Sequence, residues 1–250
     1  MIPHDTLTVK TSDGVDISLT HYASGDRQAA VIVCPGFFKS KDTPTFRRLC
    51  EALAPSYDVV AMDFRGHGRS GGWYTFSALE QADLEAVLAW ARTRYARLAV
   101  MGFSLGAAIA VTTVSRCRDQ VSSVIAVSAP CAFREIEFKW WTPEAIRGGI
   151  QGLEPGAGCR PRSLWMPKPR PIDHIARLSP IPVCFIHGTR DMIVDVHHSR
   201  RLHAAAGEPK RLDVIEGGSH AESLFRDAPH QFLALAGGWL ADTLLPPGPR

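Results

Sequence analysis

The stretch Leu98-Ala99-Val100-Met101-Gly102-Phe103-Ser104-Leu105-Gly106 joins a short apolar run to a Gly-x-Ser-x-Gly motif, and a small, apolar segment follows it to Val114. Such a run is typical of a buried strand, and the following segment is typical of a helix packed on a sheet. A sharp turn from strand to helix requires glycine on both sides of the serine, because a Cβ there would collide with neighbouring backbone. The pattern therefore predicts a strand–turn–helix that lifts the hydroxyl of Ser104 clear of the sheet.

The chemistry of this serine depends on groups elsewhere in the chain. Leu105 begins the predicted helix, so its backbone N–H is free to face a developing oxyanion. A serine hydroxyl is nearly inert at neutral pH and needs an adjacent base, which a third group must orient. We therefore expect a base and an orienting acid on loops that follow later strands.

Two residues follow the last two predicted strands. Asp191 comes after a strand expected over 183–186, and His220 comes after one expected to end at Ile215. Asp195 is a rival for the acid, and an aspartate at a strand end is often only a helix cap. The remaining histidines considered for the base do not follow the last strand: His187, His197, His198 and His203.

Strand-like and helix-like segments alternate along most of the chain, which predicts an α/β protein with a mostly parallel central sheet and helices on both faces. The first two segments alternate as antiparallel strands do, around a turn at 12–14. The strands are expected at 6–10, 15–19, 29–34, 57–62, 98–101, 121–127, 181–186 and 211–215, and the helices at 46–53, 79–95, 105–114 and 232–244.

The alternation lapses between about 131 and 178, where Trp, Pro, Gly and Arg are more frequent. We expect a single domain over 1–250, with this segment as a small cap insertion above the strand ends. Its aromatic side chains either line a substrate pocket or attach the insertion to the domain, and its basic residues either meet an anionic group or are solvated. The candidates for the pocket are Phe38, Trp140, Trp141 and Trp165.

Two further motifs precede the serine. Cys34-Pro35-Gly36-Phe37-Phe38 ends the third predicted strand, and Asp63-Phe64-Arg65-Gly66-His67-Gly68-Arg69-Ser70 follows the fourth. Together with Ser104, Asp191 and His220 in that order, they resemble the α/β-hydrolase superfamily, in its esterase, lysophospholipase and serine-aminopeptidase-like branch with a small cap. The resemblance covers nearly the whole chain and weakens only across the insertion.

This resemblance implies a catalytic triad of Ser104, His220 and Asp191. It also implies an oxyanion hole formed by the backbone N–H groups of Phe37 and Leu105. The segment 63–70 is structural in the family, so His67 is not expected to be catalytic.

One position departs from the family pattern. Pro35 stands where the family usually has histidine. The change leaves the backbone N–H of Phe37 in place but removes a side chain that often steadies the loop. By itself, the Pro-Gly pair fits a plain turn at a strand end equally well.

The expected activity is hydrolysis of a small-molecule acyl ester through an acyl-enzyme, with no cofactor and no metal. Four alternatives stay open: a thioesterase, an amidase or peptidase on the same triad, a carbon–carbon bond hydrolase, and a ligand-binding protein with low turnover. Fold alone does not separate them.

Composition argues against other classes. A net charge of +3 without a Lys- or Arg-rich run does not favour nucleic acid, and no apolar stretch approaches the roughly 20 residues of a membrane span. The first residues lack a secretory signal, and the six cysteines form no C-x-x-C pair, which together indicate a cytoplasmic location. Nothing in the sequence indicates the oligomeric state.

Two apparent ligand motifs fail on context. Gly66, Gly68 and Gly71 form a G-x-G-x-x-G, but no helix is predicted to begin at Gly71 and no acidic residue ends a following strand to hold a ribose. His197 and His198 would point in different directions on a helix, and no H-E-x-x-H accompanies them. We therefore expect neither a dinucleotide site nor a metal site.

Overall fold

The computed structural model describes residues 3–25, 27–136, 154–163 and 165–244. An eight-stranded sheet in the order β1-β2-β4-β3-β5-β6-β7-β8 lies at its centre. From β3 onward all neighbouring strands are parallel, whereas β2 pairs antiparallel with both β1 and β4. The strands are β1 (Asp5–Lys10), β2 (Asp16–Tyr22), β3 (Ala29–Cys34), β4 (Asp58–Met62), β5 (Arg97–Phe103), β6 (Ser123–Val127), β7 (Val183–Gly188) and β8 (Lys210–Ile215).

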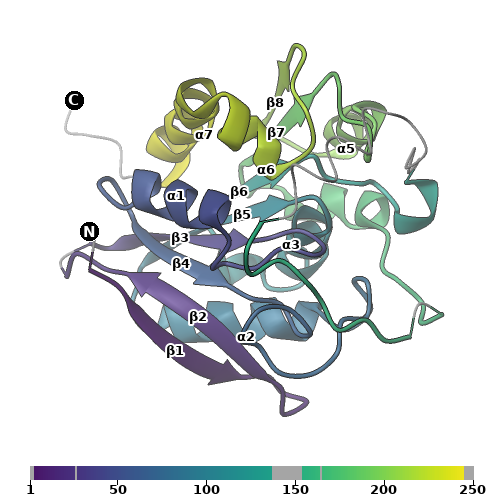
Figure 1. Ribbon diagram of the computed structural model, residues 1–250. Coiled ribbons are helices and arrows are strands. Elements are labelled where there is room, and N and C mark those ends of the chain that lie inside the picture. Colours follow the sequence, from purple (N-terminus) through teal and green to yellow (C-terminus); the bar gives the residue numbers. More distant parts are fainter. Residues whose placement is uncertain (1–2, 26, 137–153, 164, 245–250) are drawn as a thin grey trace.

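Helices cover both faces of this sheet. The described α-helices are α1 (Pro44–Leu53), α2 (Gln81–Arg92), α3 (Leu105–Val114), α5 (His197–Ala205), α6 (Glu222–Asp227) and α7 (Pro229–Leu244). Figure 1 shows α1, α6 and α7 on one side of the strands and α2 and α3 on the other. Two apolar core clusters correspond to these two layers. The expected α/β architecture is confirmed.

The burial of four elements accounts for the apolar character of their sequences. Strands β3, β4 and β6 are buried at every position, so both faces of these strands are apolar and no polar alternation is seen. Helix α3 is also buried at every position, because it packs on β5 and β6 and is covered in turn by α2. Its apolar and small residues on all sides suit that position.

Several element boundaries differ from the expected ones. Helix α1 begins at Pro44, two residues early, because proline suits the first turn of a helix. Helix α2 begins at Gln81, two residues late, and Phe76 and Ser77 in the loop before it have positive φ angles of 56° and 72°. Strand β6 begins at Ser123, after the short 3₁₀ helix η1 (Arg118–Gln120).

The described part of the expected insertion packs on the loop that follows β4. The backbone N–H of Tyr74 donates to Arg160 O at 2.8 Å, and that of Arg160 donates to Gly66 O at 2.7 Å. Gly66 has a φ of 74°, and a Cβ there would lie 2.3 Å from the backbone nitrogen of Tyr74. Glycine is therefore required for this close approach. The insertion is also attached to α1, since Glu154 Oε1 accepts the backbone N–H of Thr45 at 3.0 Å.

The remaining 3₁₀ helices are η2 (Phe133–Glu135), η3 (Pro171–Asp173) and η4 (Ile175–Leu178). Ile175 and Leu178 are buried in the core, so the last residues of the expected insertion contribute to the domain itself. None of the helices in the described ranges is both long enough and apolar enough to cross a membrane.

Candidate active site

Ser104 occupies the sharp turn between β5 and α3, with φ 51° and ψ −119°. Non-glycine residues rarely adopt this region. The glycines on either side permit the turn, because a Cβ on Gly102 would lie 2.6 Å from the Cα of Ala107 and a Cβ on Gly106 would lie 2.4 Å from Cys34 O. The predicted strand–turn–helix is therefore present, with Ser104 at its apex.

The ends of three parallel strands bring Ser104, His220 and Asp191 together. His220 Nε2 lies 2.9 Å from Ser104 Oγ, and His220 Nδ1 lies 2.7 Å from Asp191 Oδ2. The other carboxylate oxygen of Asp191 accepts the backbone N–H groups of Ile193 and Val194, at 3.0 and 2.9 Å. The rival Asp195 instead accepts the N–H of His197 at the start of α5, at 2.9 Å.

The charges of this cluster favour a basic imidazole and an ionised acid. Burial disfavours the charged form of His220, but the charge of Asp191 and its hydrogen bond outweigh this effect and raise the pKa of His220 above its ordinary value. Burial alone would raise the pKa of Asp191, yet the interactions with His220 and His187 hold it well below its usual range. Asp191 therefore stays ionised, and its carboxylate lies within hydrogen-bond distance of His220 Nδ1.

His187, which the sequence offered as another base, lies beneath Asp191. Its Nε2 is 2.8 Å from Val194 O and 3.2 Å from Asp191 Oδ2, so this nitrogen carries the proton. Its Nδ1 is 2.6 Å from Ser199 Oγ and accepts a hydrogen bond from that hydroxyl. His187 thus holds the carboxylate of Asp191 in place.

The loop after β3 directly contacts the turn that contains Ser104, which we call the elbow. A Cβ on Gly36 would lie 3.1 Å from Ser104 Cβ and 3.0 Å from Phe103 O, so the chain passes Ser104 at van der Waals contact just before Phe37. Leu105 is the first residue of α3, where a backbone N–H has no acceptor within the helix. The two predicted oxyanion donors therefore belong to segments that flank the same serine.

His67 supports the loop that contains Phe37. The imidazole Nε2 accepts the backbone N–H of Phe38 at 3.2 Å, and Nδ1 lies 3.2 Å from Arg65 O. Burial lowers the pKa of His67 to about 4, so the ring is neutral and Nδ1 donates. The sequence indicated a structural role for this segment, but it did not reveal that His67 steadies the loop whose usual histidine is replaced by Pro35.

A buried cation joins three segments at the site. Lys39 Nζ lies 3.0 Å from Glu222 Oε1 and 3.6 Å from Glu154 Oε2. Glu222 begins α6, two residues after His220, and its charge raises the pKa of that histidine while the charge of Lys39 lowers it. Nothing in the sequence pattern indicated this contact, which links the loop after β3 to the insertion.

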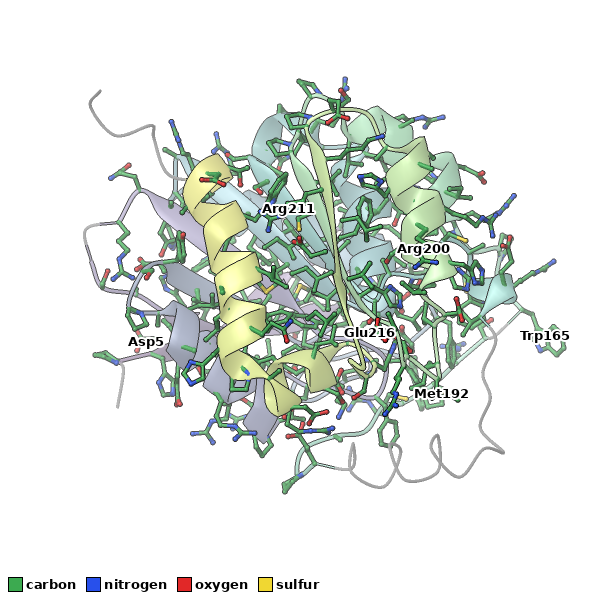
Figure 2. All side chains as sticks on the ribbon, turned by 90° about the horizontal axis from the view of Figure 1, so that it is seen from above. Asp5, Trp165, Met192, Arg200, Arg211 and Glu216 are labelled. Carbon is green, nitrogen blue, oxygen red and sulfur yellow. The ribbon has the colours of Figure 1, made fainter. Side chains whose placement is uncertain are left out.

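The four residues predicted to line the substrate pocket differ in exposure and in their place in the fold. Phe38 is 38% exposed, with its ring 6.0 Å from that of Phe37. Trp165 is 93% exposed and projects from the edge of the molecule (Figure 2), so the structure does not bring it to Ser104. Trp140 and Trp141 lie outside the described residues.

The structure also places the histidines and cysteines that the sequence analysis considered as possible metal ligands. Within the four described ranges, no group of three or more His, Cys, Asp or Glu residues is arranged to hold a metal ion. The rings of His197 and His198 stack 4.3 Å apart. All six cysteines are free thiols.

Comparisons with known proteins show the family to which the fold belongs. The alpha/beta hydrolase fold family matches residues 29–145. The uncharacterized protein Rv2307c of Mycobacterium tuberculosis is 32% identical over 228 residues, which cover 86% of this chain and 71% of that protein. The uncharacterized protein YfhR of Escherichia coli is 27% identical over 67% of this chain, and the match spans about half of its length, 55%.

Solved structures show the same fold. The Pyrococcus furiosus esterase Pf2001 has a TM-score of 0.78 at 22% identity, covering 98% of this chain and 94% of that chain. The esterase RhEst1 from Rhodococcus sp. ECU1013 has a TM-score of 0.74 at 20% identity, covering 94% and 98%. The chain belongs to the α/β-hydrolase superfamily, and the fold predicted from its sequence is confirmed.

Proposed function

We propose that this protein is a serine hydrolase that cleaves carboxylic esters through an acyl-enzyme intermediate. The observation that carries the proposal is the continuous relay from Asp191 Oδ2 through His220 to Ser104 Oγ, with distances of 2.7 and 2.9 Å. This arrangement matches the requirements of an activated nucleophile: a base within hydrogen-bond reach and a third group that orients the base.

In the acylation step, Ser104 Oγ attacks the ester carbonyl carbon while its proton moves to His220 Nε2. The carbonyl electron pair moves onto oxygen, where the backbone N–H groups of Phe37 and Leu105 stabilise the negative charge. Collapse of this intermediate breaks the bond to the alcohol, which takes the proton from His220. Asp191 stabilises the imidazolium throughout.

Deacylation repeats these steps with water. His220 accepts a proton from the water that attacks the acyl-Ser104 ester, and collapse releases the carboxylic acid and restores the serine hydroxyl. A thioester or an amide would follow the same path, so the ester preference rests on the esterases with a similar fold.

We further propose that the chain is one domain whose insertion, about 131–178, bounds the substrate site. The contact of Glu154 with both Lys39 and Thr45 supports this placement, because it attaches the insertion beside the loop that contacts Ser104. A cytoplasmic location stays a prediction from the sequence.

Hydrolysis of p-nitrophenyl esters from acetate to long acyl chains tests the proposal, using the wild type, Ser104→Ala and a control, Ser122→Ala. Ser122 directly precedes β6, at the opposite end of that strand from the site. We expect turnover by the wild type and the control, and a loss of about 10⁴-fold or more in Ser104→Ala. Equal background rates in all three proteins would overturn ester hydrolysis. Thioester and amide substrates, followed by a search for stoichiometric ligand binding, would then separate the alternatives.

A further inference from the structure

Four aromatic side chains form a continuous surface beside the candidate nucleophile; we call Phe37, Tyr74, Phe76 and Phe133 the aromatic wall. The ring of Phe37 stacks on Tyr74 at 5.7 Å and lies 5.3 Å from Phe76. Phe76 in turn lies 5.9 Å from Phe133 in an edge-on arrangement. Offset and edge-on ring pairs at these separations are favourable contacts.

The wall extends across the end of the strand that leads to Ser104. Phe37 follows β3 and Phe133 follows β6, and these two strands are the neighbours of β5 on either side. Phe76, from the loop after β4, contacts both of these rings. Because the carboxyl ends of parallel strands meet at one edge of the sheet, the wall and the serine share that edge.

The wall is not simply part of the apolar core. Its base is Tyr74, which is 1% exposed, but Phe37 is 41% exposed despite its ring neighbours. Phe76 has a φ of 56°, a conformation that is unusual for an aromatic residue. Thr75 maintains this turn, because its backbone N–H donates to Glu80 Oε1 at 2.6 Å. The strained backbone of Phe76 presents a partly exposed ring to Phe37, and the loop of Phe37 contacts Ser104 through Gly36. Strain of this kind beside a reactive group indicates a binding role.

The position of His220 indicates which part of an ester the wall would meet. His220 follows β8 and must give its proton to the departing alcohol, so the alcohol lies on the β8 side of Ser104. Three of the four wall residues follow β3 and β4, which lie on the other side of β5 from β8: Phe37, Tyr74 and Phe76. Phe133 follows β6 and joins them through Phe76. The acyl group, bonded to the same carbonyl carbon, is therefore directed away from His220 and toward the rings.

We propose that the aromatic wall binds the acyl group and selects esters with an aromatic or bulky apolar acyl group over acetyl esters. This inference rests on the proposed ester hydrolysis. An added aromatic contact is worth about 0.5–1.5 kcal/mol beyond the area that it buries, which corresponds to a discrimination of about 2- to 12-fold in kcat/KM.

The test compares p-nitrophenyl phenylacetate with p-nitrophenyl acetate on the wild type, Phe76→Ala and Phe133→Ala. We expect each variant to lower the ratio of kcat/KM for phenylacetate over acetate by about three- to tenfold. Both substrates are measured on one preparation, so any loss of folded protein cancels in the ratio. Trp73→Ala is the matched control, since Trp73 is a 51% exposed aromatic residue on the same loop.

An unchanged ratio in both wall variants would overturn the inference while leaving ester hydrolysis in place. An equal fall in Trp73→Ala would also overturn it, because the effect would not belong to the wall. If the wild type hydrolyses neither ester, the proposed function fails. Calorimetric binding of the two intact esters to Ser104→Ala then tests whether the aromatic wall binds the acyl group. Tighter binding of the phenylacetate that is lost in Ser104→Ala/Phe76→Ala supports the wall, and equal binding of the two esters overturns it.

Discussion

The side-chain oxygen of Ser128 accepts a hydrogen bond of 3.0 Å from the backbone N–H of Ala221, the residue that follows His220. Ala221 has φ 49° and ψ −116°, nearly the conformation of Ser104. Ser128 also has a positive φ, of 48°. A hydrogen bond between the loops after β6 and β8 thus holds a strained backbone beside the imidazole, so Ser128 is a positioning residue for His220.

Ser128→Ala leaves the N–H of Ala221 buried without this acceptor, which costs about 1–3 kcal/mol in the arrangement that supports His220. We expect kcat for a p-nitrophenyl ester to fall about tenfold with little change in KM, because the substrate contacts are unaffected. Equal kcat values for wild type and Ser128→Ala would contradict this role.

Asp191→Asn removes the charge that keeps His220 in the productive tautomer. By analogy with other serine triads, we expect kcat to fall by about 10⁴-fold. Asp195→Asn is the matched control, because Asp195 accepts the N–H of His197 at the start of α5. Steady-state kinetics of the two variants show which of the two aspartates supports His220. Similar losses in both would remove Asp191 from its proposed role.

The activity should depend on pH through His220. The pKa of this histidine is raised above its ordinary value of 6.5, since the charge and hydrogen bond of Asp191 outweigh burial. Acidification adds a proton to Nε2 and removes the base, so kcat/KM falls as the pH drops, with a midpoint above pH 6.5. A pH profile of kcat/KM that stays flat down to about pH 5 would contradict this assignment.

Removing His67 should impair oxyanion stabilisation without touching the triad. His67→Ala deletes the acceptor of the Phe38 N–H, which frees the loop next to Phe37, the proposed oxyanion donor. We expect kcat to fall by about 10- to 100-fold, less than the loss of a whole oxyanion donor. His67→Gln retains an acceptor and recovers part of kcat. His203→Ala, on α5, serves as the control and should match the wild type.

Gly106→Ala tests the packing of the elbow. The added Cβ would lie 2.4 Å from both Cys34 O and Pro35 O, so backbone must move and we expect the free energy of unfolding to fall by about 2 kcal/mol or more. Gly237→Ala is the opposite case, because Gly237 lies within α7 with nothing within 4 Å of its Cβ position. That variant should gain about 0.5–1 kcal/mol. Urea unfolding of both proteins measures the difference.

The fold and the positions of the site residues were predictable where the signal is local. The apolar run before Ser104 and the small residues after it predict a strand, a turn and a helix, and the structure has them at Arg97–Phe103 and Leu105–Val114. The family motifs predict the α/β-hydrolase fold, which is confirmed. Helix starts were less accurate: α2 begins at Gln81 and not at 79, after a loop in which Phe76 has a positive φ that propensity does not reveal. The catalytic roles of Ser104, Asp191 and His220 stay predictions.

Contacts between distant segments could not be predicted in this way. Ser128 and Ala221 are 93 positions apart, and their contact depends on the register of β6, β7 and β8. The same holds for the bond from Phe38 to His67 and for the ring contact of Phe76 with Phe133. A local pattern records which strand or helix a segment prefers, because that preference arises from neighbouring residues. Which loop ends meet depends on strand order and on packing across the whole sheet, and these exist only in the folded chain.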